Sequence, residues 1–246
     1  PYDQQFRKEG LTELGKPVAP NFRFLLGTDQ LGRDLLSRVL WGGRVSLSVG
    51  FTAALLSVLV GLLIGGFSGY AGGAIDFAIM RLVDLMMSVP SFLMMLMLVV
   101  ILKPGVWVVV FVIAVFGWTG YARNFRSQVV SVKEQDYVLA ARAIGVPGRR
   151  IFFVHILPHL APLSIVYVTL GIPSTIFAET GLSFLGLGVP PPIPAWGGIM
   201  QAGISFYRAA PWIVLTPGLI IMVTVIALTL VGNALREAMD PTMRGR

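Results

Sequence analysis

The chain has 246 residues, of which 55% are hydrophobic and 13% are charged, and its net charge is +7. Globular domains carry about 25% charged residues, so the composition excludes a soluble domain that covers a core of this size. The absence of cysteine excludes disulfides, thiolate metal sites and cysteine nucleophiles. The basic excess is typical of loops beside anionic lipid and does not require a nucleic-acid partner.

The charged residues are clustered, and none occurs between Arg44 and Asp76. About 20 apolar residues form a helix long enough to cross a bilayer, so we expect a polytopic membrane protein with its first span over 45–69. Glycines recur every four residues in this span, which allows close approach of a second helix from this chain or from a partner. These glycines are Gly61, Gly65 and Gly69.

Residues 1–43 form an arm that precedes the first span. A helix start is predicted at Thr28 or Asp29, whose side chains can cap free amides. The following turns carry acid–base pairs at favourable four-residue spacing, namely Asp29/Arg33 and Asp34/Arg38. We expect an amphipathic helix on the membrane surface that turns into the span at Gly42 and Gly43. Exposed ion pairs contribute little, so the interpretation is a shaping element.

Four further spans are expected over residues 86–102, 106–122, 161–178 and 211–233, which gives five in all. Residues 180–207 are also uncharged, but they contain prolines at 190, 191, 192 and 194 together with several glycines. Proline and glycine disfavour a continuous helix. We therefore expect short helices folded back at the membrane surface, with a sixth span as the alternative.

The distribution of lysine and arginine predicts the orientation. With five spans, one side of the membrane receives loops 70–85 and 123–150 and the tail after Asn233, which carry one, six and three basic residues. The other side receives Lys103, Arg208 and the arm. The arm disagrees with its seven basic residues, but a preceding helix would place it outside. We expect loop 123–150 and the C-terminus in the cytoplasm.

A short helix is predicted in loop 123–158, where Asp136 can cap residues 137–144 and Gly145 can end them. One face of this helix would present Tyr137, Ala140, Ala141 and Ile144. A small apolar face flanked by Arg142, Arg149 and Arg150 suits a groove on a cytoplasmic protein. A solvated basic loop is the equally weighted alternative.

The spacing of Ala140-Ala141, Gly145 and Leu157-Pro158 resembles the EAA loop of ABC importer permeases. Two positions depart from that pattern: Leu139 stands where glutamate is expected and His155 where isoleucine is expected. Flanking segments resemble the C-type permease of the oligopeptide/dipeptide branch. They are Asp136-Tyr137, Gly27-Thr28-Asp29, Gly32-Arg33-Asp34, Ser37-Arg38 and Glu179-Thr180-Gly181-Leu182-Ser183-Phe184-Leu185-Gly186.

This resemblance implies an all-α type I ABC importer permease fold with a further helix before Pro1. It implies a heterodimer with a B-type permease, two cytoplasmic ATPases docked at the EAA loops, and an external binding protein that delivers peptide. The chain itself would be no enzyme, with ATP and Mg held by the ATPases. We divide it into the arm (1–43) and a transmembrane domain (44–246) with docking loop 123–158 and an external folded-back segment 179–210. The same branch includes importers of nickel chelates, glutathione and oligosaccharides.

Other chemistry finds little support in the sequence. No G-x4-G-K-[ST] motif occurs, and His155 and His159 have no acid or cysteine nearby that would complete a metal site. Glu179 contacts either a binding protein or substrate amine, or hydrogen-bonding groups of its own chain, which we favour. A group of methionines offers an adaptable surface or, as we favour, core packing: Met86, Met87, Met94, Met95 and Met97. An ion-coupled secondary transporter remains the alternative of another class, although the spans lack mid-depth charges.

Overall fold

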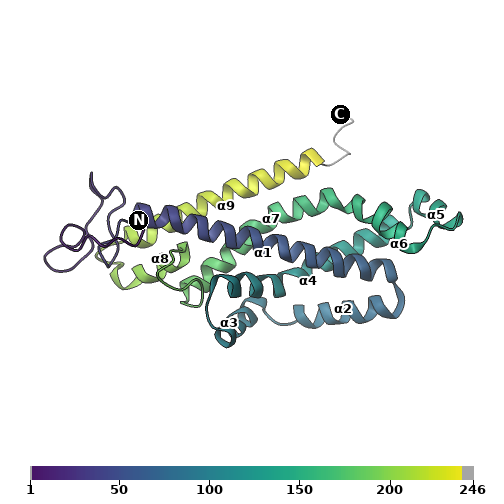
Figure 1. Ribbon diagram of the computed structural model, residues 1–246, viewed down its shortest axis with the longest axis horizontal. Coiled ribbons are helices and arrows are strands. Elements are labelled where there is room, and N and C mark those ends of the chain that lie inside the picture. Colours follow the sequence, from purple (N-terminus) through teal and green to yellow (C-terminus); the bar gives the residue numbers. More distant parts are fainter. Residues whose placement is uncertain (1, 240–246) are drawn as a thin grey trace. The chain divides into compact units, whose positions relative to one another are not determined.

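The computed structural model describes residues 2–239, in which a non-helical arm (2–34) precedes a series of helices (Figure 1). Within these residues the strand-like pairs are three isolated bridges in the arm. The helices in chain order are α1 (Leu35–Ala71), α2 (Gly73–Met87), α3 (Ser91–Leu102), α4 (Val106–Lys133), α5 (Asp136–Ala143), α6 (Gly148–Arg150), the π-helical η1 (Ile151–Ile156), α7 (Leu157–Phe184), α8 (Trp196–Gly203), the 3-10 helix η2 (Ile204–Phe206) and α9 (Trp212–Met239).

Four helical stretches are long and apolar enough to cross a membrane: α1, α4, the continuous stretch Gly148–Phe184, and α9. Helices α2 and α3 pass the same test only as a pair, and they are bent by 85° at their junction, the geometry of a broken span or of a re-entrant loop. Four of the five expected spans are therefore confirmed, and the α2–α3 pair takes the place of the remaining one. The basic residues Arg244 and Arg246, which contribute to the predicted orientation, lie outside the described residues.

The chain folds as two compact units. The first takes in the described residues up to Thr52, with Leu96–Val112 and Pro173–Leu228. The second takes in Ala53–Met95, Ile113–Ile172 and the described residues from Thr229 onward. Helices α1, α3, α4, α7 and α9 contribute residues to both units.

The helix start predicted at Thr28 or Asp29 is a turn. Asp29 Oδ1 accepts hydrogen bonds from the N–H groups of Leu31 at 2.9 Å and Arg33 at 3.0 Å, which is the local pairing that aspartate offers in turns. Gly32 has φ +70°, a left-handed conformation that interrupts helical geometry. The acidic side chain is therefore used to close a turn, and no helix can propagate from it.

Helix α1 instead begins at Leu35, with Asp34 as its cap: Asp34 Oδ2 accepts the N–H of Ser37 at 2.9 Å. The helix then runs without a break through Gly42 and Gly43. The separate surface helix predicted for the arm is therefore wrong, because residues 35–43 are the start of the first spanning helix.

The second predicted span is wrong in detail. Residues 70–85 were expected as a loop, but α2 occupies Gly73–Met87, and the helix breaks after it because Pro90 disfavours helical geometry at the residue before it. The fourth span begins earlier than predicted, at Gly148, through a π-helical segment in which the N–H of Leu157 reaches the carbonyl of Phe152. Pro158 cannot donate to the preceding turn, and a π segment relieves the clash of its ring.

The prediction that residues 180–207 do not form a span is confirmed, since no spanning stretch includes 185–207. The irregular part begins later than expected, because α7 continues through Glu179 to Phe184. It then leads to α8, which packs on α7 so closely that a Cβ at Gly197 would lie 2.8 Å from the Cβ of Ser183.

Candidate docking helix and transport surfaces

The predicted docking helix exists as α5, and its residues divide between a buried and an exposed face. Val138 is fully buried and Ala141 is 7% exposed, and both belong to a core cluster that includes Phe125, Ile151 and Ile156. Of the predicted apolar face, Ala141 therefore packs inside the chain. The remaining three residues are exposed: Tyr137 at 42%, Ile144 at 81%, and Ala140.

Gly145 ends α5 with a left-handed residue, at φ +79°. The N–H of Gly145 donates to the Arg142 carbonyl and the N–H of Val146 to the Ala141 carbonyl, each at 3.0 Å. This pair of bonds is the Schellman arrangement, in which glycine avoids the steric cost of a side chain. The predicted role of Gly145 in ending the helix is therefore confirmed.

Within the second unit, Tyr70 fixes the segment after α5 to the end of α1 through a hydrogen bond and a ring contact. The hydroxyl of Tyr70, near the end of α1, donates to the carbonyl of Gly148 at 2.8 Å, and its ring lies 5.4 Å from that of Phe152. Leu157 is half-buried in the same core cluster and Pro158 is exposed. Docking loop 123–158 is thus mostly helical, and α5 is held between two anchored segments.

The three flanking arginines are exposed and form no ion pair with any residue of the described chain. They are Arg142, Arg149 and Arg150. The prediction that Asp136 caps α5 is wrong, because Asp136 is its exposed first residue and the N-cap is Gln135, which makes no side-chain cap hydrogen bond. These charges border the exposed apolar face and are available to a partner.

The glycines of α1 pack inside the chain, against α4. A Cβ at Gly61 would lie 2.6 Å from the Cβ of Tyr121, one at Gly65 would collide with the carbonyl of Ala122, and one at Gly69 would lie 2.8 Å from the carbonyl of Arg126. The four-residue spacing therefore serves contact between two helices of the same chain, one of the two alternatives left open by the sequence.

Charged pairs that sequence reasoning missed join α2 to α4. Arg126 binds Asp76 through two parallel contacts, and Arg123 Nη2 lies 2.6 Å from Asp84 Oδ1. Asp76 also accepts the hydroxyl of Ser68 at 2.6 Å. The signal was the set of opposite charges on segments 70–85 and 123–133, which could be paired only after both were recognised as helices.

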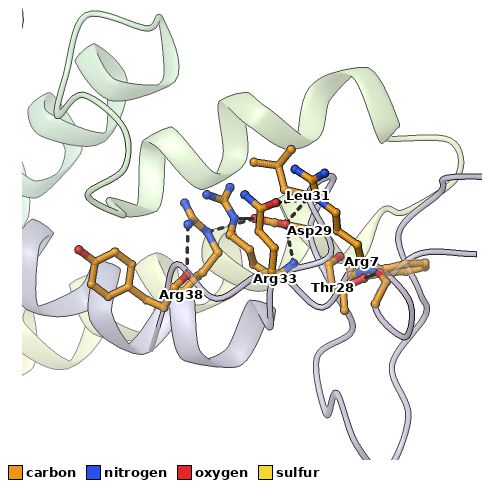
Figure 2. A network of polar contacts seen from close by, with 10 residues as sticks. Arg7, Thr28, Asp29, Leu31, Arg33 and Arg38 are labelled. Carbon is orange, nitrogen blue, oxygen red and sulfur yellow. Dashed lines mark hydrogen bonds and ion pairs between the residues drawn. The ribbon is translucent and has the colours of Figure 1, made fainter.

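In the first unit, one buried carboxylate holds two buried guanidinium groups. Asp29 Oδ2 lies 2.6 Å from Arg33 Nε and 3.2 Å from Arg38 Nε, as Figure 2 shows. Asp29 is 2% exposed. The prediction of exposed pairs is wrong, and Arg38 pairs with Asp29 in place of Asp34. The pairing ties the turn at residues 28–34 to the first turns of α1.

Thr28 connects the same turn to the rest of the arm and to α9. Its hydroxyl donates to the carbonyl of Gly10 at 2.6 Å and accepts the N–H of Val18 at 2.8 Å, while its carbonyl accepts the indole N–H of Trp212 at 3.2 Å. A side chain at Gly27 would collide with that indole. The arm is therefore an ordered part of the first unit.

Glu179 is fully buried near the end of α7. Its Oε1 accepts the hydroxyl of Ser183 at 2.7 Å. In the same unit Ser46 of α1 accepts the backbone N–H of Trp196, whose indole donates to the Val39 carbonyl at 3.0 Å. The carboxyl group thus faces its own chain, which supports the structural interpretation over contact with an external partner.

Four helices long and apolar enough to cross a membrane, together with the bent α2–α3 pair, define a polytopic membrane protein. Residues 32–245 match the family of binding-protein-dependent transport system inner membrane components, and the chain belongs to that family. The chain is therefore a permease component of an ABC importer, which confirms the resemblance in the EAA loop.

Curated relatives support this assignment. The chain is 38% identical over 234 residues to the oligopeptide transport system permease protein OppC of Bacillus subtilis, covering 95% of this chain and 76% of the relative. It is 41% identical over 247 residues to the di/tripeptide transport system permease protein DppC of Pseudomonas aeruginosa, covering 99% and 81%. A chain of the inward-facing MetNI methionine ABC transporter has the same fold, with TM-score 0.66 at 16% identity over 82% of this chain and 96% of that chain.

Proposed function

We propose that this chain is the C-type permease subunit of an ATP-driven importer of dipeptides or oligopeptides. The support is its 38–41% identity, over at least nine tenths of its length, to permeases named for peptide transport. Membership of the importer family removes the support for the ion-coupled secondary transporter. Energy then comes from ATPase partners, which hold ATP and Mg.

The single observation that carries the coupling role is the two-sided burial of α5. Val138 and Ala141 attach the helix to the core of the second unit, while Tyr137 and the C-cap residue Ile144 leave an apolar face uncovered. A helix with an exposed apolar face suits a groove on a partner protein. Because the buried face is packed into a core that includes α4 and η1 residues, movement of a docked ATPase is transmitted to the spans.

The remaining partners follow from the importer assignment. A B-type permease forms the other half of the path, a second ATPase docks on that permease, and an external binding protein delivers peptide. Docking loop 123–158 and the C-terminus face the cytoplasm in this proposal. The basic residues that flank α5 support this orientation, because cytoplasmic loops carry the excess of arginine and lysine.

Capture of the tagged chain from its native membrane tests the proposal. The expected proteins, identified by mass spectrometry, are a second permease, two ATPases and a binding protein. Ile144→Asp places a charge on the exposed apolar face and should lower ATPase recovery at least about tenfold, as loss of an interface anchor does. Gln135→Asp places the same charge just outside α5 and should leave recovery unchanged.

Equal ATPase recovery with both variants would contradict docking through α5. Recovery of the chain alone, in detergent that preserves a control complex, would contradict the importer assembly.

A further inference from the structure

The bend between α2 and α3 borders an open cavity. Helix α2 ends at Met87 and α3 begins at Ser91, and the two helices meet at 85° (Figure 1). Ser88 closes α2, since its N–H donates to the carbonyl of Asp84 at 3.0 Å. Val89 makes no backbone hydrogen bond with any described residue. Pro90 has no N–H to offer.

The cavity has a volume of about 370 Å³, within the range of sites that hold small ligands. Its lining combines residues of the bend with residues of α4, all within the second unit: Met86, Met87, Ser88, Ser91, Phe116 and Thr119. None of these side chains is charged. The cavity is therefore lined by apolar side chains and by the hydroxyl groups of Ser88, Ser91 and Thr119.

The free polar groups at the bend point to a ligand. Irregular backbone within a membrane-spanning segment is tolerated only where protein or a water-filled cavity covers it. Val89 and Ser91 are exposed, and within the described residues neither the Val89 backbone nor the Ser91 hydroxyl has a hydrogen-bond partner. Thr119 donates to the Phe116 carbonyl at 3.2 Å, which leaves the lone pairs of its oxygen free to accept. The bend thus offers both donors and acceptors.

A neighbouring cavity of about 330 Å³ shows the contrast. It is lined by Asp76, Asp84, Arg123 and Arg126, whose charges already pair with one another. A ligand there would have to compete with these ion pairs. At the bend, no pairing has to be broken before a ligand can bind.

We propose that the cavity at the α2–α3 bend is a subsite for the main chain of the transported peptide. This inference rests on the proposed function of the chain as a peptide permease. Amide N–H and C=O groups of the peptide would pair with Val89, Ser91 and Thr119. Core packing was favoured for Met86 and Met87, but Met86 is half-buried, Met87 is 47% exposed and both line the cavity. They would accommodate varied side chains, because methionine is flexible and polarizable. In other transporters, discontinuous spanning helices form substrate sites in which unpaired backbone groups bind the substrate.

The absence of cysteine from the chain permits a direct test. The complete transporter with Ser91→Cys is reconstituted in proteoliposomes with enclosed ATP and external binding protein. Uptake of labelled dialanine is measured before and after treatment with a methanethiosulfonate reagent. The matched control is Ser205→Cys, an exposed serine of η2 that lies outside the docking loop and does not line the cavity. The wild-type complex, treated alike, controls for cysteines of the partners.

Modification of Ser91→Cys should lower uptake at least about tenfold, because an added group occupies the space that must position the substrate. The control should keep its uptake. Dialanine supplied during turnover should also slow the labelling of Ser91→Cys but not of Ser205→Cys.

Both results are required, and the absence of either overturns the subsite. If the wild-type complex and the control import dialanine while modified Ser91→Cys imports it equally well, only the subsite fails. If none of the complexes, wild type included, imports dialanine or longer peptides, the proposed function fails with it.

Discussion

Arg126 of α4 holds Asp76 of α2 by two parallel contacts, with Nε 2.6 Å from Oδ1 and Nη2 2.5 Å from Oδ2. This geometry uses the planar fork of arginine, which lysine cannot reproduce. The pair stands at the start of α2, beside the end of α1, where Lys133 also donates to the Gly69 carbonyl at 3.1 Å. Together, the Arg126–Asp76 pair and the Lys133–Gly69 hydrogen bond connect α1, α2 and α4 within the second unit.

Arg126→Lys should lower the stability of the second unit. A hydrogen bond to a charged group contributes about 1.5–3 kcal/mol, and the remaining 37% exposure of the Arg126 side chain reduces this by solvent screening to about 1 kcal/mol. The measurement is the apparent melting temperature of the purified complex. Arg123→Lys is the matched control, because the Arg123–Asp84 pair is 50% exposed on both sides and should contribute less. Equal shifts would show that the bidentate geometry adds nothing.

Gly65→Ala should force α1 and α4 apart, because the new methyl group would collide with the backbone carbonyl of Ala122. Overpacking of this kind costs about 1–3 kcal/mol. The adjacent Gly66→Ala is the control: its Cβ would lie 3.5 Å from Phe152, an ordinary contact. Thermal unfolding and membrane yield of the two variants should differ clearly, and a tolerated Gly65→Ala would contradict the close packing.

Gly145→Val should uncouple ATP hydrolysis from uptake without preventing membrane insertion. A left-handed backbone costs about 1–2 kcal/mol for a residue with a side chain and more for a β-branched one, so the turn after α5 would rearrange. Gly145→Asn should retain coupling, since asparagine tolerates this conformation. The measurement is the ratio of ATP hydrolysed to peptide imported. Normal uptake by Gly145→Val would count against transmission through α5.

Glu179→Gln should transport as the wild type does, because the amide keeps an oxygen that can accept the hydroxyl of Ser183. Glu179→Ala should destabilise the first unit by about 2–3 kcal/mol, since it leaves a cavity and an unpaired hydroxyl. Melting temperature and uptake are measured for both variants. A stable, assembled Glu179→Gln complex that fails to transport would show that the charge itself serves transport.

Much of the architecture could be predicted from local patterns. The uncharged runs located most of the spans, and the prolines at 190–194 correctly excluded another. Gly145 was correctly identified as the end of α5 because a left-handed helix end strongly favours glycine. The break at Ser88–Pro90 was missed: the apolar run from Met86 to Leu102 looks continuous, and hydropathy does not register the geometry that Pro90 imposes.

The sequence by itself determined the membrane class, the approximate spans and the short helix α5, since each depends on residues close together in the chain. Only the tertiary structure decided how distant residues pair. In the folded chain Ala141 is buried in the core and Ile144 is exposed. Gly65 packs against the backbone of Ala122. Arg33 and Arg38 both form ion pairs with Asp29. Hydrophobic spacing fixes which residues share a helix face, but the partner of that face depends on packing and charge neutralisation between segments far apart in sequence.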